Sequence, residues 1–482
     1  MSNFAVMENE VIANLYARWA GDACVSVTPV SGAGSNRRYY RVKGQGNHST
    51  VIATVGDDVA ENKAFVYLSR HFARLGLSVP EVLSVSDDSH VYFQTDLGDT
   101  SLFDMLPSRG EDPHVRAYLE KTMRMMARLQ YVGCNGLDFT RCFPVEAMDR
   151  RAIMWDLNYF KYCFLKAIGI TFSEPLLEDD FERLASMLAA GDDCTTVMLR
   201  DFQSRNVMIS DGEPYIIDFQ GARRGYPEYD VASMLWQAKA GFTDAERRRY
   251  VNVYLDEASR QAPLDQTAFE KRLRMMVLFR LMQVLGAYGF RGYFENKAHF
   301  MTSIPQAVAN LREILPWIPA SLGYLRGVLA EICDDGRFAS TDDADGLTVR
   351  VTSFSYKRGG VPRDTSGNGG GFVFDCRAIH NPGRYEQYKA LTGRDRQVIE
   401  FLEDNGEIFK FLENAFRLVD ASVERYISRG FNNLMVSFGC TGGRHRSVYS
   451  ADAMARHLSE KYGVRVVLEH VARGTTEIYP AR

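Results

Sequence analysis

The sequence has few of the features that mark secreted or zinc-binding proteins. It contains eight cysteines in 482 residues, and no two of them form a Cys-x-x-Cys pair. Scattered cysteines argue against a disulfide framework or a zinc site and favour a reducing interior. The first twenty residues carry Glu8 and Glu10 and lack the basic start and apolar core of a signal peptide. We therefore expect a cytoplasmic protein.

Strong charge and long apolar runs are also missing. The formal net charge is -4, so the composition gives no general attraction to nucleic acid or to a membrane surface. We see no run of the roughly twenty apolar residues that a membrane-spanning helix needs, so we expect no membrane association. A hydrophobic fraction of 46% is ordinary for a packed protein. The length suggests two or three domains.

The order of the predicted elements divides the chain into two folded parts. Residues 1–332 begin with short strand patterns around one helix and continue with helical patterns, which predicts an α+β domain with a small strand-rich lobe and a larger helical lobe. Residues 333–346 are small and acidic and are interpreted as a solvated linker. In residues 347–482 strands alternate with helices, which predicts a smaller α/β domain.

The most informative motif consists of two short runs, Leu199–Asn206 and Tyr215–Gln220. Asp201 and Asn206 stand five positions apart in the first run, and Asp218 ends an apolar strand pattern in the second. Phosphoryl-transfer sites have this layout: one Asp orients the acceptor hydroxyl, while an Asn and a second Asp hold Mg²⁺ against the nucleotide phosphates. We therefore predict a phosphotransferase that uses ATP and Mg²⁺. A chance pairing of surface carboxylates is the weaker interpretation.

A loop of small residues precedes the second predicted strand. Gly32, Gly34, Ser35 and Asn36 can bring backbone N–H groups close to nucleotide phosphates, although a plain hairpin turn explains them equally well. Arg37 and Arg38 follow on alternate faces of the strand, so one of them is expected to face phosphate. Arg38 is the residue that we assign to the nucleotide.

These runs resemble the aminoglycoside phosphotransferase and choline kinase superfamily over about residues 15–332. The resemblance is closest to the AmgK-type bacterial anomeric kinases of N-acetylmuramate and N-acetylglucosamine. It implies a protein-kinase-like bilobal fold, with Asp201 as the catalytic base, Asn206 and Asp218 as metal ligands, and Asp230 as the brace of the catalytic loop. It also implies phosphorylation of the anomeric hydroxyl of an N-acetylhexosamine in cell-wall sugar salvage.

The chain departs from the superfamily pattern at two positions. The strand pattern Val51–Val55 lacks the usual lysine, so Arg38 or Lys63 would have to supply its charge, with Glu61 as the nearest carboxylate. The residue before the catalytic Asp is Arg200 where the superfamily usually has His. The first departure leaves open how the nucleotide is held.

The acceptor site is weakly marked in the sequence. The segment Arg151–Leu165 stands where the superfamily places acceptor-binding groups, and Asp156 and Asn158 are polar positions among aromatic residues. Such a mixture suits a sugar, whose hydroxyls need partners and whose ring stacks on aromatic side chains. Arg224, just after the metal loop, is another candidate. A solvated helix position explains Asp156 at least as well.

A second motif, Gly439–Ser447, follows a strand pattern and opens a helix pattern. Backbone N–H groups at a helix N-terminus bind anions, and Arg444, His445 and Arg446 add positive charge. The same run has the Cys-x5-Arg-Ser layout of cysteine phosphatases, whose thiolate such a loop stabilises. The motif therefore predicts phosphate recognition, with hydrolysis as an alternative.

The C-terminal block resembles the C-terminal domain of the bacterial regulator RapZ, which senses glucosamine-6-phosphate. The resemblance rests on Ser353–Lys357, Phe374–Arg377, Asn381-Pro382, Leu391–Asp395 and Gly439–Val448. It implies a hexosamine-phosphate pocket made by Asp375, Arg377, Cys440, Thr441, Gly442, His445 and Arg446. One departure is Gly383, where the regulator has a His that His380 would have to replace. The regulator's domain also contacts RNA and forms oligomers. An oligomer is therefore possible here, but the few basic residues give no support to RNA binding.

These motifs together predict a sugar kinase fused to a hexosamine-phosphate sensing domain. Two alternatives belong to other classes. One is a regulatory sugar-phosphate or RNA-binding protein with a degenerate kinase lobe, and the other is a kinase joined to a phosphatase. The intact Asp201, Asn206 and Asp218 argue against a degenerate lobe, whereas the missing strand lysine argues for it.

Overall fold

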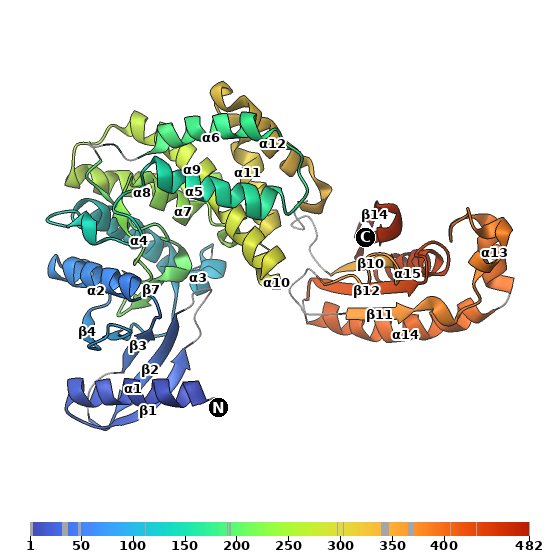
Figure 1. The fold of residues 1–482 in the computed structure, drawn as a ribbon, viewed down its shortest axis with the longest axis horizontal. Helices are drawn as coiled ribbons and strands as arrows, with labels where there is room; N and C mark the ends of the chain where they lie inside the picture. The colour runs from blue at the N-terminus through green and yellow to red at the C-terminus, as the bar shows by residue number, and fades with distance from the viewer. Residues whose placement is uncertain are drawn as a thin grey trace. The chain divides into compact units, whose positions relative to one another are not determined.

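The computed structural model describes residues 3–30, 37–46, 50–110, 112–189, 191, 194–295, 297–301, 303–338, 347–364, 371–404, 406–429 and 431–481. The chain divides into two compact units (Figure 1). The first comprises Met1–Ala287 and Gln306–Gly336, and the second comprises Tyr288–Pro305 and Arg337–Arg482. The predicted phosphate loop of Gly32, Gly34, Ser35 and Asn36 lies outside the described residues, as does most of the predicted linker, 339–346.

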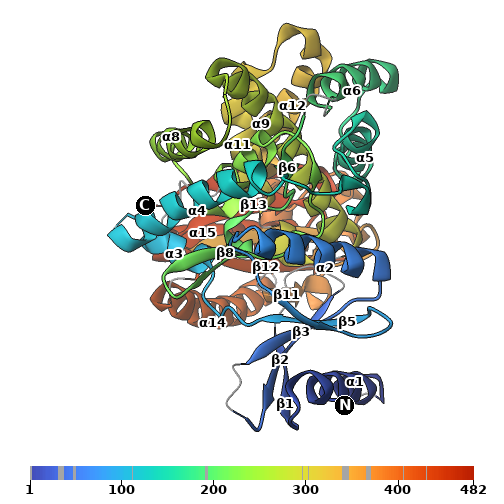
Figure 2. The same cartoon turned by 90° about the vertical axis from the view of Figure 1, so that its left-hand side faces the viewer.

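The small lobe of the first unit is a five-stranded antiparallel sheet (Figure 2). Its strand order is β1-β2-β3-β5-β4, with β1 (Cys24–Val30), β2 (Arg38–Gly44), β3 (Val51–Val55), β4 (Val82–Val85) and β5 (Val91–Thr95). Ile12 and Tyr16 of helix α1 (Asn3–Ala20) pack with Val42, Ala53 and Phe93 of the sheet. Burial of these apolar side chains fixes which face of each strand turns toward the core.

Helix α2 (Val59–Arg74) begins with a side-chain cap. Asp58 accepts hydrogen bonds from the backbone N–H groups of Ala60 and Glu61, as an N-cap residue does. The buried Phe65, Leu68 and Phe72 lie on one side of the helix. Glu61, in the first turn, thereby takes a fixed place near the start of β2.

The large lobe is helical and carries the phosphotransfer motif on short hairpins. Ser101 caps α3 with a capping box. The helices are α3 (Leu102–Met105), α4 (Pro113–Tyr131), α5 (Arg150–Phe160), α6 (Glu174–Leu188), α7 (Glu228–Leu235), α8 (Asp244–Gln261), α9 (Gln266–Gly289), α11 (Ile304–Ile314) and α12 (Gly323–Asp334). The hairpin strands are β6 (Val197–Met198) with β9 (Arg223–Arg224), and β7 (Val207–Ser210) with β8 (Glu213–Ile216).

One helical run differs from the sequence expectation. Gln266–Phe294, which is α9 with the π-helical turn η6 (Phe290–Phe294), is long and apolar enough to cross a membrane by length and composition. However, 61% of its most apolar window is buried inside the protein. Val277, Leu278 and Met282 of α9 are fully buried. This burial is that of a core helix in the large lobe.

The second unit contains a five-stranded mixed sheet of order β11-β12-β10-β13-β14. Its elements are β10 (Thr348–Ser355), β11 (Gly371–Asp375), β12 (Asn433–Cys440), β13 (Arg465–His470), β14 (Thr475–Tyr479), α10 (Ala298–Met301), α13 (Arg396–Asp404), α14 (Glu407–Ser428) and α15 (Arg446–Tyr462). Helix α15 packs on β10, β12 and β13, and α14 packs on α15. The predicted fold class, a bilobal α+β domain followed by a smaller α/β domain, is confirmed.

The sequence did not predict the antiparallel edge strand β14. Its side chains are mostly exposed, so the segment lacks the apolar pattern that marks a buried strand.

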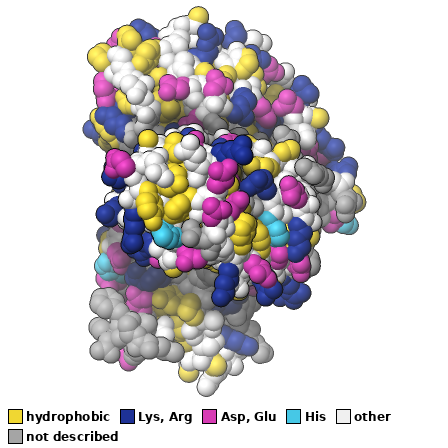
Figure 3. Space-filling view, turned by 90° about the vertical axis from the view of Figure 1, so that its right-hand side faces the viewer, with side chains coloured by type: hydrophobic (Ala, Val, Ile, Leu, Met, Phe, Trp, Pro, Cys, Tyr) yellow, Lys and Arg dark blue, Asp and Glu magenta, His cyan; other side chains and the backbone are white. Residues whose placement is uncertain are grey.

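On the face shown in Figure 3, basic and acidic side chains are interspersed rather than gathered by sign. The described residues on that face therefore form no basic stripe of the kind that nucleic acid binds.

Candidate active site and C-terminal phosphate loop

Asp230 of α7 binds the backbone of the loop Leu199–Asn206. One carboxylate oxygen accepts a hydrogen bond from the backbone N–H of Leu199 at 2.7 Å, and the other accepts one from the backbone N–H of Arg200 at 2.9 Å. The side-chain amide of Gln130 also donates to Asp230, at 2.8 Å. Burial raises the pKa of Asp230 to about 6. Asp230 therefore braces the loop, as the resemblance implies.

Asp230→Ala should lower the free energy of unfolding by about 3 kcal/mol, because two backbone N–H groups and one amide would be left buried without their acceptor. The exposed Asp256→Ala in α8 is the matched control and should change stability by less than about 0.5 kcal/mol. Urea titration followed by circular dichroism measures both variants. A loss below about 1 kcal/mol for Asp230→Ala would show that water replaces the carboxylate.

Asp201 is held by groups from its own loop and from α9. Its carboxylate accepts hydrogen bonds from Gln203 Nε2 at 2.6 Å and from Arg280 Nη2 at 3.0 Å. Burial alone would raise the pKa of Asp201, but the charges of Arg280 and Arg205 outweigh it and hold the pKa below its usual range. Asp201 is therefore ionised and fixed in orientation. A carboxylate that binds and deprotonates a substrate hydroxyl needs both properties.

Asn206 and Asp218 lie together beside Asp201. Asn206 Nδ2 donates to the backbone carbonyl of Asp201 at 2.9 Å, and Gln220 Nε2 donates to Asp218 at 2.8 Å. Asp218 has φ 61°, the left-handed region that L-residues rarely adopt. Burial and the nearby charge of Asp201 raise the pKa of Asp218. A bound cation would offset both effects.

The donor set fits Mg²⁺ only in part. Among the described residues, no group of three or more His, Cys, Asp or Glu side chains is arranged to hold a metal ion. Asn206 and Asp218 offer oxygen ligands, which Mg²⁺ prefers. Mg²⁺ usually keeps waters and substrate phosphates as its other ligands, so these two side chains suit an ion that arrives with a nucleotide.

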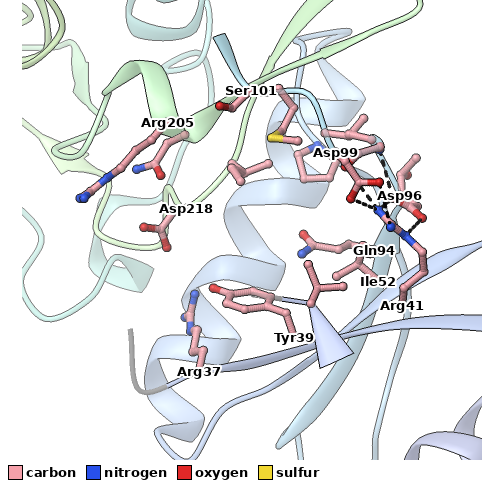
Figure 4. A pocket seen from close by; sticks show the side chains of 18 of the residues that line it. Arg37, Tyr39, Arg41, Ile52, Gln94, Asp96, Asp99, Ser101, Arg205 and Asp218 are labelled. Atoms are coloured by element: carbon pink, nitrogen blue, oxygen red, sulfur yellow. Dashed lines mark hydrogen bonds and ion pairs between the residues drawn. The ribbon is translucent and has the colours of Figure 1, made fainter. Parts of the chain in front are cut away.

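A cavity of about 540 Å³ adjoins the metal-binding candidates (Figure 4). Arg37, Arg205 and Asp218 lie at one side of it, and Arg41 and Asp96 lie at the other. Arg41 donates two hydrogen bonds to the carboxylate of Asp96, at 2.6 and 3.0 Å. Apolar side chains complete the lining: Val30, Ile52, Phe65, Leu97, Met208 and Ile217. Charged groups beside the metal-binding candidates, together with apolar walls, suit a nucleotide, whose phosphates need the first and whose base needs the second.

The structure places Arg37, and not Arg38, in this cavity. Arg37 is buried and its Nη2 lies 3.5 Å from Oε1 of Glu61. Arg38 pairs instead with Glu8 at 2.8 Å and Asp57 at 3.1 Å, and it is absent from the described lining. Successive strand residues point to opposite faces, so only one of the two can face the cavity.

The Arg37–Glu61 pair brings a positive charge to a cavity whose described lining contains no lysine. Lys63, the other substitute considered from the sequence, is exposed on α2. The charge therefore comes from the residue before β2 rather than from β3.

The three acceptor candidates do not form one site. Asp156 accepts two hydrogen bonds from Arg200 Nη2, at 3.0 and 3.1 Å, so its carboxylate orients the residue before Asp201. Asn158 lines a separate cavity with Lys161, Glu174 and Glu178. Arg224 lines a further one, together with Cys142, Glu146 and Asp149 among others. Neither of these two cavities contains Asp201 among its described lining residues.

Sequence reasoning missed Arg280, which contacts Asp201 directly. It stands 79 positions after Asp201 in the sequence, and no motif surrounds it. The available signal was a single arginine within the apolar run Met275–Leu285. A charge inside a buried helix normally has a partner, and here that partner is the catalytic candidate.

In the second unit, Cys440 ends β12 and faces the start of α15. Its Sγ lies 3.1 Å from the hydroxyl oxygen of Ser447, and the side chain is 3% exposed. Burial would raise the pKa of the Cys440 thiol. The hydroxyl of Ser447 and the backbone N–H groups of Ser447 and Arg444 outweigh burial, and they lower the pKa below its ordinary value. This loop therefore stabilises negative charge.

The other predicted pocket residues lie around this loop but are already engaged. Arg377 forms a two-pronged ion pair with Asp375 and stacks on the ring of Tyr356. Arg446 donates through Nη1 to the backbone carbonyls of Arg377 at 3.0 Å and Ile379 at 2.7 Å. Its Nε is buried without a hydrogen-bond partner among the described residues. Arg446 thus ties the loop to the segment after β11 and keeps one donor unused.

Thr441, Gly442 and His445 differ in what they offer a ligand. The backbone carbonyl of Thr441 accepts a hydrogen bond from Ser355, at 2.9 Å. A Cβ added to the exposed Gly442 would meet no atom within 4 Å, so open space lies beside it. His445 Nε2 lies 2.9 Å from the backbone carbonyl of Tyr388, and burial lowers the pKa of the imidazole. His445 is therefore tied to the backbone at Tyr388, and its predicted role as a ligand contact stays a prediction.

Comparison with known proteins supports this two-part organisation. Residues 26–264 match the family model described as "Phosphotransferase enzyme family", and residues 347–473 match the "RapZ C-terminal domain". A "Nucleotide-binding protein" from Xylella fastidiosa is 34% identical over 178 residues, which are 36% of this chain and 59% of the relative. A protein of the same description from Acidithiobacillus ferrooxidans is 39% identical over 132 residues, 27% of this chain and 42% of the relative.

The chain spans 59% or less of the length of these relatives. Among solved structures, choline kinase LicA from Streptococcus pneumoniae aligns with a TM-score of 0.45 and 15% identity, over 64% of this chain and 99% of that one. A choline kinase from Cryptosporidium parvum aligns with a TM-score of 0.47 and 12% identity, over 67% and 99%. Two consecutive parts of the chain are thus similar to a phosphotransferase family and to the RapZ C-terminal domain.

Proposed function

We propose that the protein is an ATP- and Mg²⁺-dependent sugar kinase with a second binding site for a hexosamine phosphate. The observation that carries the kinase assignment is the position of Asp201. This carboxylate is held by Arg280 and Gln203 and is adjacent to Asn206, which lines the nucleotide-sized cavity together with Asp218. Catalysis of phosphoryl transfer is mostly positioning and charge neutralisation, which these groups provide.

Each residue has a distinct part in the proposed reaction. Asp201 would accept a hydrogen bond from the acceptor hydroxyl and receive its proton as the hydroxyl oxygen bonds to the γ-phosphorus, while the bond from that phosphorus to the β,γ-bridging oxygen breaks and ADP leaves. Asn206 and Asp218 would hold Mg²⁺, which when bound neutralises charge on the nucleotide phosphates. Arg37, with its charge fixed by Glu61, would contact the same phosphates.

We propose an N-acetylhexosamine, either N-acetylmuramate or N-acetylglucosamine, as the acceptor and its anomeric hydroxyl as the reacting group. This part rests on the resemblance to anomeric kinases, since Asn158 and Arg224 do not lie at Asp201. A cell-wall sugar salvage route would supply such an acceptor.

Phosphorus NMR of the product tests the position of transfer. With ATP, Mg²⁺ and N-acetylglucosamine or N-acetylmuramate, the product signal should couple to the anomeric proton, because the phosphate would be on C1. A parallel reaction with the 1-O-methyl glycoside of N-acetylglucosamine, which has no free anomeric hydroxyl, should give no product. Coupling to the C6 methylene protons would contradict the anomeric assignment while leaving the kinase assignment intact.

The proposed second site is the loop between β12 and α15, and it favours binding over hydrolysis. The lowered pKa of Cys440 also suits a phosphatase nucleophile, so that alternative has a specific observation behind it. The thiol is almost fully buried and Arg446 is tied to backbone carbonyls, which leaves little room for attack on phosphorus. Arg446 Nε remains as a buried donor for a phosphate.

Calorimetry on the full chain with glucosamine-6-phosphate separates the two alternatives. Cys440→Ser should change the affinity less than about three-fold, because the thiol is only a wall of the site. Arg446→Ala should weaken binding by about ten-fold or more, since it removes a charged donor to phosphate. Arg425→Ala, on α14, is the control for loss of an arginine elsewhere in this unit. Release of inorganic phosphate by wild type but not by Cys440→Ser would establish the phosphatase instead.

A further inference from the structure

Gln94 brings a buried acceptor without a partner among the described residues to the nucleotide-sized cavity. Gln94 lies in β5, lines the cavity and is only 8% exposed. Its Oε1 has no hydrogen-bond partner among the described residues. A buried acceptor left unsatisfied costs about 1–3 kcal/mol, so its presence points to a ligand that supplies the missing donor.

Thr54 fixes the direction of this amide. Gln94 Nε2 donates to Thr54 Oγ1 at 3.2 Å, and Thr54 is fully buried on the neighbouring strand β3. Ile52 stands directly opposite Gln94 in the pairing of β3 with β5 and lines the same cavity. Thr54 accepts from one of the two N–H groups of Nε2, and Oε1 is the amide atom left without a partner among the described residues, so Gln94 offers an acceptor at the cavity.

The surroundings of Gln94 suit a flat heterocyclic base. Ile52, Leu97 and Met208 provide apolar walls. Asp218 and Arg205 lie at the opposite side of the cavity from Ile52 (Figure 4). The Arg41–Asp96 ion pair holds the segment that follows β5, so this wall keeps its shape. A base in this position would have its ring between apolar side chains and one edge toward Gln94.

We propose that Gln94 selects the nucleobase by accepting a hydrogen bond from the exocyclic amine of adenine, which makes the protein specific for ATP over GTP. Guanine carries a carbonyl oxygen at the corresponding ring position, and two acceptors facing each other repel. Sites built around a buried hydrogen-bonding group reject analogues that leave the group unpaired. This inference rests on the proposed kinase function and adds the residue that reads the base.

The test compares binding of three nucleotides to the full chain by calorimetry, with Mg²⁺ and no sugar. The nucleotides are ATP, GTP and purine riboside 5′-triphosphate, which is ATP without its exocyclic amine. Wild type should bind ATP about ten-fold more tightly than either of the others, as expected for one buried hydrogen bond. Gln94→Met keeps the side-chain volume and removes the acceptor, so its affinity for ATP should fall to that for purine riboside triphosphate.

Met208→Leu is the matched control within the same cavity. It changes an apolar wall and no polar group, so it should alter the affinities for ATP and purine riboside triphosphate by the same factor. Equal wild-type affinities for these two nucleotides, or tighter binding of GTP, would overturn the role of Gln94. So would an unchanged preference in Gln94→Met, and if that variant fails to fold the wild-type comparison decides alone. Failure to bind any of the three would instead reject the proposed nucleotide site.

Discussion

Asp201→Asn should lower kcat by about a thousand-fold while leaving the fold intact. The amide keeps the size of the side chain but cannot take the proton of the acceptor hydroxyl, and groups in this role typically contribute 10²–10⁴-fold. Asp201 acts in the transition state, so the KM values for sugar and nucleotide should change by only a few-fold. The measurement is a steady-state assay of ADP formation over a range of both substrates.

Two controls test whether the loss of kcat is specific to Asp201. Asp256→Asn makes the same chemical change on the exposed side of α8 and should keep wild-type kcat. Calorimetric binding of ATP with Mg²⁺ should survive in Asp201→Asn, which shows that the site is assembled. If Asp201→Asn turns over within a few-fold of wild type, with unchanged thermal stability, Asp201 is not the catalytic base.

Arg37→Met should weaken binding of Mg²⁺-ATP by about ten- to a hundred-fold, whereas Arg38→Met should stay within about two-fold of wild type. The first substitution removes a buried charge at the phosphate end of the cavity and leaves Glu61 without its partner. Charged hydrogen bonds to phosphate are among the stronger ones in proteins, and charge pairs at an exposed surface contribute little. Arg38→Met is therefore the matched control for Arg37→Met.

Calorimetric titration of both variants with Mg²⁺-ATP measures this difference. Arg37→Lys separates charge from shape, because a lysine keeps the positive charge but not the planar fork, and it should recover part of the affinity. Equal losses in Arg37→Met and Arg38→Met would contradict the structural assignment. A larger loss in Arg38→Met would restore the assignment made from the sequence.

The sequence by itself determines the catalytic loop and its order of side chains. Asp201, Asn206 and Asp218 lie within 18 consecutive positions, and their geometry depends on one short hairpin. The loop from Gly439 to Ser447 is likewise local, since a strand, a glycine turn and a helix N-terminus follow one another directly. Short-range backbone geometry is encoded by residue type, so these sites are visible without a structure.

Only the tertiary structure decides which of two alternating arginines enters the cavity, and which distant residue holds Asp201. Strand alternation predicts that Arg37 and Arg38 diverge, but the burial of one sheet face determines that Arg37 turns inward. Arg280 reaches Asp201 because α9 is a core helix of the large lobe, a packing that no local pattern encodes. Asn158 and Arg224 line two different cavities for the same reason. The packing of the helices and hairpins determines which surface each of them reaches. Local sequence thus specifies the reacting groups, and long-range packing specifies their partners.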